Sequence, residues 1–137
     1  MGSNDESKEL EAKLKEIYKM GVYPLSAAER LKELEPLKNY LEELKASKKV
    51  KRLLKVFKAL SNTNRIIMLL LISHGIRCSC ELEYLMDLSQ STVSHHLSVL
   101  LDAELIEVER KGKWSFFHTK KAYHKSFLED LIKKITE

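Results

Sequence analysis

The chain has few of the residues that interrupt helices and few of those that cross-link small domains. It contains 2 prolines and 4 glycines among 137 residues, so long helices are expected. The 2 cysteines, Cys78 and Cys80, are too few for a disulfide framework, and they lie too close in sequence for an unstrained bond to each other. We therefore expect reduced thiols in a cytoplasmic protein.

Long hydrophobic runs are also missing. The longest, around residues 66–72, is far shorter than a membrane span, and no secretory signal pattern opens the sequence. A glycine-rich phosphate loop, a nucleophile with its base, and paired carboxylates are absent as well. These absences predict a soluble intracellular protein that has no membrane partner and is not an enzyme.

Charge is unevenly distributed along the chain, although the net charge is only +4. Residues 1–44 carry ten acidic and seven basic side chains, a net charge of −3, and residues 45–137 carry ten acidic and seventeen basic ones, a net charge of +7. A basic unit can neutralise phosphates, so residues 45–137 are the expected nucleic-acid-binding part. Seven basic residues between Lys45 and Lys58 form a dense cluster whose role stays open.

The first part of the chain is predicted to be a helical extension over residues 1–47. One helix is expected from about Asp5 to Met20. A second helix begins after Ser26, which forms a capping box with Glu29. It carries leucines spaced by three and four up to residue 44, and Pro36 is expected to kink or interrupt it.

Residues 48–137 are predicted to form one domain of the mainly α class with a single β-hairpin. Helices are expected over 50–60, with its apolar side chains inward, and over 65–73, 80–86 with Ser79 as its cap, 90–103 and 121–136. Residues 76–78 are expected to form a short strand. Alternating residues around Lys111-Gly112 predict a two-stranded hairpin over 106–110 and 113–119.

Two segments point to DNA. Residues 88–97 have a turn followed by a helix whose early positions are small and polar, and residues 110–114 form a basic hairpin tip. A helix lying in the major groove beside a cationic hairpin is typical of a winged helix-turn-helix. The residues predicted to contact bases or phosphates are Gln90, Ser91, Thr92, Ser94, His95, Arg110, Lys111 and Lys113.

Several motifs resemble, in the same order, those of the arsenic-repressor (ArsR/SmtB) family of winged-helix regulators. They are residues 57–61, Arg65-Ile66, residues 78–82, residues 88–97 and residues 112–114, within a match over about 48–120. Asn62-Thr63-Asn64 stands where the family commonly has Asp-Pro-Thr. The resemblance implies a homodimeric prokaryotic regulator, a repressor that binds operator DNA, with a dimer built from residues 48–60 and 121–136. The interface residues expected there are Leu53, Phe57, Tyr123, Phe127, Leu131 and Ile135.

Cys78 and Cys80 have two open interpretations. Thiolates two positions apart at a helix entrance can bind a soft ion such as Zn, Cd, Pb or As, and in the family a Cys-x-Cys at this place belongs to the metal site of several sensors. Glu83 replaces the third cysteine of arsenic sensors, and Lys121-Ala122-Tyr123 does not reproduce the metal site on the family's last helix. The alternative is a structural or redox-active thiol pair.

Two other functions compete with a DNA-binding regulator. The first is a winged-helix protein-interaction module that recruits a partner through the leucine-rich helix of residues 26–44. The second is a metal or redox buffer with incidental DNA affinity. The basic wing disfavours the first alternative, and the presence of only 2 thiols disfavours the second.

Overall fold

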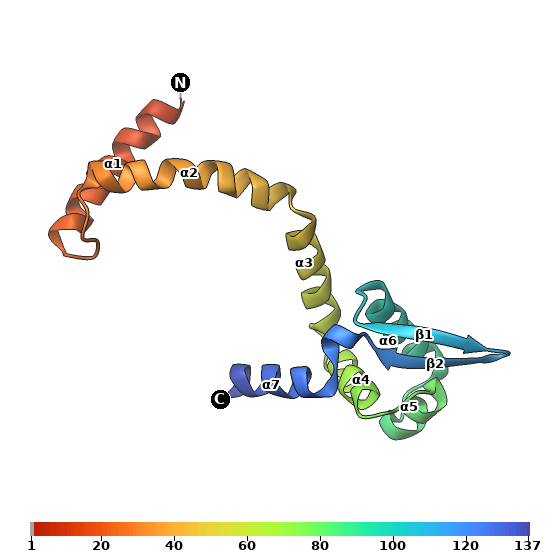
Figure 1. Ribbon diagram of the computed structural model, residues 1–137. Helices are drawn as coiled ribbons and strands as arrows, with labels where there is room; N and C mark the ends of the chain where they lie inside the picture. The colour runs from red at the N-terminus through yellow and green to blue at the C-terminus, as the bar shows by residue number, and fades with distance from the viewer. Residues whose placement is uncertain (1) are drawn as a thin grey trace. The chain divides into compact units, whose positions relative to one another are not determined.

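The structure is a computed structural model that describes residues 2–137, with side chains from Asn4 onward. The elements are α1 (Gly2–Lys19), α2 (Ala27–Ala46), α3 (Lys48–Leu60), α4 (Thr63–Ser73), α5 (Ser79–Met86), α6 (Gln90–Asp102), β1 (Ile106–Lys111), β2 (Trp114–Thr119), the 3-10 helix η1 (Lys121–Tyr123) and α7 (Lys125–Thr136). They divide into two compact units, one reaching Val50 and the other Lys51–Glu137. The predicted class, mainly α with one β-hairpin, is confirmed (Figure 1).

The N-terminal unit is built from α1 and α2, which pack against each other (Figure 1). The predicted capping box is present: the Ser26 hydroxyl accepts from the Glu29 N–H at 3.3 Å, and the Ser26 N–H donates to Glu29 Oε2 at 2.9 Å. Of the predicted kink or interruption at Pro36, the interruption is wrong, because α2 continues through this residue. A proline removes one N–H from the helix, and the remaining turns keep their own hydrogen bonds.

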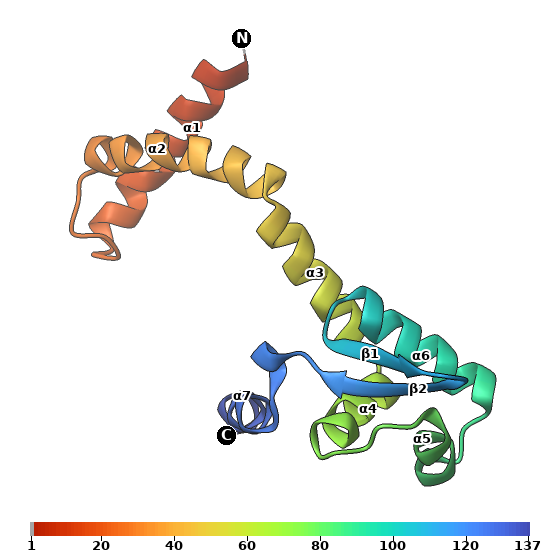
Figure 2. The same cartoon turned by 45° about the vertical axis from the view of Figure 1, so that its right-hand side comes forward.

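The core of the second unit lies where α4, α6 and the β-hairpin meet. Its largest fully buried side chains are Met68 and Ile72 from α4, Leu82 from α5, Val93 and Leu100 from α6, and Leu105 and Ile106 at the start of the hairpin. In Figure 2 the hairpin lies beside α6. Burial of this apolar surface is the main term that holds the winged-helix unit together.

The hairpin is antiparallel and pairs residues from Ile106 with Thr119 to Lys111 with Trp114. Gly112 follows β1 with a φ of 60°, which a two-residue hairpin turn requires at its first central position and which glycine adopts without a steric penalty. The predicted hairpin is confirmed. Its tip, Gly112-Lys113, carries one of the three predicted cationic wing residues.

Two predicted elements differ in the structure. Residues 76–78 form no strand; one backbone hydrogen bond joins this segment to β2, from the Phe117 N–H to the Arg77 carbonyl at 2.8 Å. The last helix is not continuous, because η1 ends at Tyr123 and His124 begins a new helix as its N-cap. The imidazole Nδ1 of His124 accepts from the Phe127 N–H at 3.2 Å, which satisfies one of the free donors of α7.

Helix α3 is where the expected inward packing is wrong. Ala59 is the only α3 side chain that the structure fully buries, and Val56 and Leu60 are partly buried against the core. Leu53, Leu54 and Phe57 stay exposed in the single chain. Periodicity correctly indicated an apolar stripe, but this stripe does not face the chain's own core.

Among residues 2–137, no single helix has both the length and the apolar composition of a membrane span. Helices α3 and α4 reach these limits only when they are counted together, as a pair bent by 97°.

Candidate nucleic-acid interface

The helix-turn-helix consists of α5 and α6 and the short turn between them. Asp87 ends α5 in the left-handed conformation with a φ of 51°, and its N–H donates to the Glu83 carbonyl. Ser89 begins α6 as its N-cap, with its hydroxyl accepting from the Thr92 N–H at 3.2 Å. The two helices pack against each other. Local backbone chemistry therefore sets where the second helix begins.

Helix α6 has one buried and one exposed face. Val93, Leu97 and Leu100 are buried in the core. The predicted DNA contacts on α6 that are exposed are Gln90, Ser91, Ser94 and His95. Thr92 differs from these, because it is half-buried and its Oγ1 accepts a hydrogen bond from the Ser89 hydroxyl at 2.8 Å. Its side chain supports the start of the helix and is less accessible than its neighbours.

The wing presents Arg110, Lys111 and Lys113 as exposed side chains around the hairpin tip. Lys111 Nζ lies 3.7 Å from Glu109 Oε1, so its charge is partly balanced. Lys113 Nζ lies 5.4 Å from the centre of the Trp114 ring. These three cations and the polar face of α6 both belong to the Lys51–Glu137 unit, and together they form the candidate DNA-binding surface.

His96 follows the predicted DNA contact His95 on α6, but it does not share the exposure of that residue. It is buried, and the Arg65 guanidinium donates to its Nδ1 at 3.3 Å. Arg65 also donates to the Lys58 and Ala59 carbonyls at the end of α3, so it joins α3, α4 and α6. Burial lowers the pKa of His96, and the positive charges of Arg65 and His95 lower it further. His96 is therefore a neutral packing residue that supports the back of α6.

Two side chains of the basic cluster before and along α3 form ion pairs with acidic residues of the Lys51–Glu137 unit. Arg52 pairs with Glu104, and Lys55 Nζ lies 3.4 Å from Asp102 Oδ2. Both acceptors lie at or just after the end of α6. Exposed ion pairs of this kind contribute little stability, but they balance two of the seven cluster charges.

Cys78 and Cys80 are joined by a disulfide, which overturns the expectation of reduced, unbridged thiols. Their Cα atoms are 5.2 Å apart, within the usual range for a disulfide. Cys78, and not Ser79 as predicted, is the N-cap of α5: its sulfur accepts from the Cys80 N–H at 3.3 Å. Its own N–H donates to Glu81 Oε1 at 2.9 Å, which completes a capping box.

The residues around Cys78 and Cys80 do not fit a metal ion as the structure places them. Each sulfur is bonded to the other, and thiolate ligands must be free and deprotonated. In the part of the chain that the structure describes, no group of three or more His, Cys, Asp or Glu side chains comes together. The Glu81 carboxylate already accepts from two backbone N–H groups, those of Arg77 and Cys78.

The predicted dimer residues form two exposed stripes and one internal contact. Leu53 and Phe57 lie on α3, and Phe127, Leu131 and Ile135 lie on α7; all five are exposed. Tyr123 differs, because it is half-buried against the core and meets the Phe127 ring edge-on at 6.1 Å.

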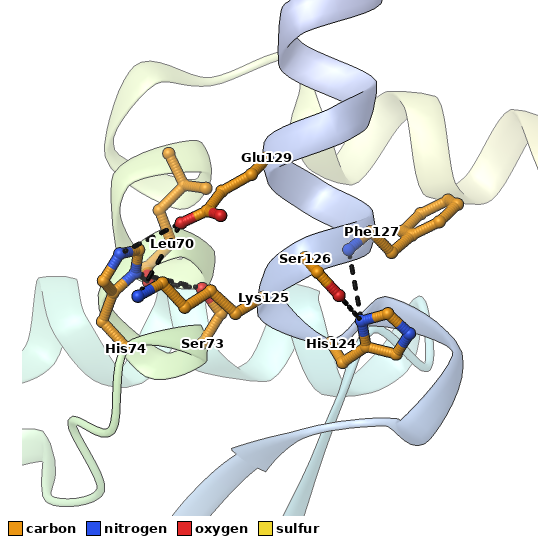
Figure 3. A network of polar contacts seen from close by, with 8 residues as sticks. All are labelled: Leu70, Ser73, His74, His124, Lys125, Ser126, Phe127 and Glu129. Carbon is orange, nitrogen blue, oxygen red and sulfur yellow. Dashed lines mark hydrogen bonds and ion pairs between the residues drawn. The ribbon is translucent and has the colours of Figure 1, made fainter.

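The other side of α7 is fastened to α4 by polar contacts (Figure 3). Glu129 Oε1 lies 3.7 Å from His74 Nε2 and 3.8 Å from Lys125 Nζ, and His74 Nδ1 contacts the Leu70 carbonyl at 2.8 Å. This attachment orients α7 within its own chain while its apolar stripe stays uncovered.

The sequence profile described as bacterial regulatory protein, arsR family, matches residues 62–108. The arsenical resistance operon repressor of Staphylococcus aureus is 33% identical over 85 residues, which cover 62% of this chain and 78% of that protein. The chain belongs to the arsR family. This confirms the resemblance, and the family is one of regulatory proteins, as the sequence predicted.

Other arsR-family relatives match over a shorter part of their length. The arsenical resistance operon repressor of Bacillus subtilis is 45% identical over 62 residues, 44% of this chain and 59% of that protein. The arsenic resistance regulator ArsR1 of Pseudomonas putida is 41% identical over 63 residues, 45% of this chain and 49% of that protein. The chain thus spans 59% and 49% of the length of these two relatives.

Solved structures show the same fold. The homodimeric winged helix-turn-helix DNA-binding domain of Mb0332 from Mycobacterium bovis superposes with a TM-score of 0.60 at 22% identity, covering 69% of this chain and 85% of that one. HlyU from Vibrio cholerae superposes with a TM-score of 0.57 at 23% identity, covering 66% of this chain and 99% of that one. The winged helix-turn-helix predicted from the sequence is therefore confirmed.

Proposed function

We propose that this protein is a homodimeric, sequence-specific DNA-binding transcriptional regulator that acts as a repressor in the cytoplasm. Its partners are operator DNA and a second copy of the chain. The observation that carries the proposal is the exposed polar face of α6 beside a wing with three cations. The names of two relatives as arsenical resistance operon repressors support it, as does the homodimeric DNA-binding neighbour.

The chemistry of α6 suits the major groove. Gln90 can form a bidentate pair with adenine, and the hydroxyls of Ser91 and Ser94 pair with any base or with phosphate. His95 extends the same exposed face. Lys111 and Lys113 on the wing hold the phosphate backbone, which sets the register of the helix in the groove without reading sequence.

The proposed contact between the wing and the phosphate backbone can be tested by removing the lysine charges of the wing. Removing both charges with Lys111→Gln and Lys113→Gln should weaken binding to all duplexes and reduce the slope of log affinity against log salt. Each lost phosphate contact contributes about 0.9 to that slope. Because Glu109 already balances part of the Lys111 charge, we expect a decrease between about 0.9 and 1.8 per protomer.

Fluorescence anisotropy of a labelled duplex, titrated at several salt concentrations, measures this slope. A matched control removes the same charge from α7 with Lys133→Gln and Lys134→Gln, and it should leave the slope unchanged. Equal slopes for the wing variant and the wild type would contradict the wing assignment.

The proposal assigns different roles to the two parts of the chain. Residues 48–137 bind DNA and form the dimer through the stripes on α3 and α7, and residues 1–47 are a helical extension. On α2 the extension keeps Leu37, Tyr40 and Leu41 exposed. This exposure favours a second candidate function, a protein-interaction module; such a module would bind a partner through α2 and would not bind DNA.

We also propose that Cys78 and Cys80 respond to redox conditions, supported by the bond between them. In exchange with a small-molecule disulfide, the two thiols become one intramolecular disulfide and the reagent leaves as two thiols, so two electrons pass from the protein to the reagent. Because Cys78 caps α5, changing this bond alters the start of the first helix of the helix-turn-helix.

The thiol proposal is tested by DNA affinity in a thiol reductant and in oxidised glutathione. Affinity should change between the two conditions for the wild type and stay constant when Cys78→Ser and Cys80→Ser are combined. Adding Cd(II) or As(III) to the reduced protein tests the alternative, a thiophilic ion as the signal. Release from DNA by the ion but no response to oxidation would replace redox sensing with metal sensing.

A further inference from the structure

A shallow cleft of about 600 Å³ separates α6 from the base of the wing. Hydroxyls from three elements line it: Ser94 and Ser98 lie one turn apart on α6, Ser115 lies on β2, and Ser79 lies at the start of α5. Arg110 of β1 completes the polar lining. Ser98 and Ser115 are not among the DNA contacts predicted from the sequence, and the structure places both of them in this cleft.

The guanidinium of Arg110 is available to a ligand in this cleft. Its one hydrogen bond to a protein side chain in residues 2–137 is long, 3.4 Å from Nη1 to the Ser115 hydroxyl, and it makes no ion pair in that range. A guanidinium has five donors in a planar fork that matches two oxygens of a phosphate. The hydroxyls nearby add single donors with rotatable hydrogens.

Resting on the DNA-binding function proposed above, we propose that this cleft seats one phosphate of the DNA backbone, held by Arg110 and by the hydroxyls of Ser98 and Ser115. The recognition helix of a winged helix-turn-helix lies in a groove and the wing contacts the neighbouring backbone, so a backbone strand passes between the two elements. The cleft lies between these same two elements, α6 and the hairpin.

The shape and charge of the cleft favour a polymer phosphate over an enclosed small molecule. Small-molecule sites bury most of the ligand's surface, whereas this cleft is shallow and open to solvent, which leaves room for a continuous backbone. Its one carboxylate, Asp102, is partly balanced by Lys55 at 3.4 Å. Leu97 and Phe117 form a buried apolar floor that keeps the two walls in place.

The cleft is tested with the full-length protein and a duplex in which single phosphates are replaced by neutral methylphosphonates. At one position per half-site, the replacement should weaken binding of the wild type about ten- to a hundredfold, the usual range for a hydrogen-bonded charge. The Arg110→Gln variant should lose no further affinity at that position, because the interaction is already absent. Its salt slope should decrease by about 0.9.

Serine variants distinguish hydrogen bonds in the cleft from general effects of charge, because they remove a hydroxyl and leave the net charge unchanged. Ser98→Ala and Ser115→Ala should each weaken binding about two- to tenfold at an unchanged salt slope, and their losses should also vanish at the same methylphosphonate. Ser126→Ala and Lys121→Gln are the matched controls and should bind like the wild type. Arg110→Lys keeps the charge, so it should restore the slope but only part of the affinity.

The outcomes are distinguishable. If Arg110→Gln and the methylphosphonates have additive effects at every position while the Lys111 and Lys113 double variant still lowers the slope, the cleft proposal is wrong and the DNA-binding function stands. Inorganic phosphate, added at constant ionic strength, distinguishes a second outcome. If it binds the free protein through Arg110 but does not weaken DNA binding, the cleft is a site for free anions and the proposal of a backbone phosphate is wrong. If no variant and no salt concentration reveals DNA binding, the proposed function itself fails.

Discussion

The exposed stripe on α3 makes a quantitative prediction about assembly. Phe57 is 62% exposed in a single chain, although it is a large apolar side chain in the middle of the helix. Complete burial of such a side chain contributes about 1.5–3 kcal/mol, so covering the exposed part contributes roughly 1–2 kcal/mol. A twofold interface buries the residue twice, which gives roughly 2–4 kcal/mol per dimer.

Phe57→Ala should therefore raise the dimer dissociation constant about 30- to 700-fold. Leu131 on α7 is 39% exposed, so the same reasoning predicts a smaller increase for Leu131→Ala, about 7- to 50-fold. Sedimentation equilibrium over a concentration series measures both constants. Tyr84→Ala is the control: Tyr84 is 87% exposed on α5, outside both stripes, and its removal should not change the constant.

Circular dichroism of the variants checks that each chain remains folded, which the exposure of both residues leads us to expect. A wild type that is monomeric at micromolar concentration would refute the reasoning. So would a Phe57→Ala protein that dimerises as tightly as the Tyr84→Ala control.

Two further predictions concern the folded chain itself. Burial lowers the pKa of His96 from its usual 6.5, so as the pH falls the unfolded chain takes up this proton before the folded chain does. The free energy of unfolding should therefore be highest above pH 6.5 and decrease as the pH falls below it. Urea titrations from pH 7.5 to 5 measure this decrease, and His96→Gln should remove the part of it that is due to His96. Ser26→Ala removes the N-cap of α2, which contributes about 1 kcal/mol to the stability of that helix end. Amide hydrogen exchange in the first turn of α2 should therefore accelerate about fivefold, while exchange in α6 stays unchanged. Equal exchange rates in the first turn of α2 for the wild type and the variant would contradict the cap.

The elements that the sequence predicted well are those with local causes. Ser89 caps α6 through atoms three residues away, and Gly112 supplies the turn of the hairpin, so both boundaries are encoded in adjacent residues. The same holds for the Ser26 capping box. The boundaries of the winged-helix elements are therefore encoded locally and do not depend on contacts between distant residues.

The contacts that escaped prediction join distant parts of the chain. Arg65 and His96 are 31 positions apart, and no spacing rule connects an arginine on one helix with a histidine on another. Their sequence signal was an arginine at the start of an apolar helix, which indicates a helix terminus but not a partner. Likewise, periodicity showed that α3 carries an apolar stripe but could not show which surface covers it.

The cysteine pair shows a different limit. The sequence led us to expect free thiols at Cys78 and Cys80, yet Cys78 adopts the extended conformation of an N-cap and Cys80 lies in the first turn of α5, which brings the two sulfurs together. The same local geometry explains why Ser79 does not cap α5. Serine is the more common cap residue, but the backbone at Cys78 is the one that turns into the helix.

The central claim is that the polar face of α6 and the wing bind operator DNA as a dimer, and footprinting of the full-length protein on the DNA upstream of its own gene tests it most directly. We predict one protected near-palindrome whose half-sites are about 10 base pairs apart, or a multiple of that, with protection lost when Gln90→Ala and Ser94→Ala are combined. Protection that is absent, or that covers the DNA uniformly and survives these substitutions, would contradict sequence-specific binding by α6.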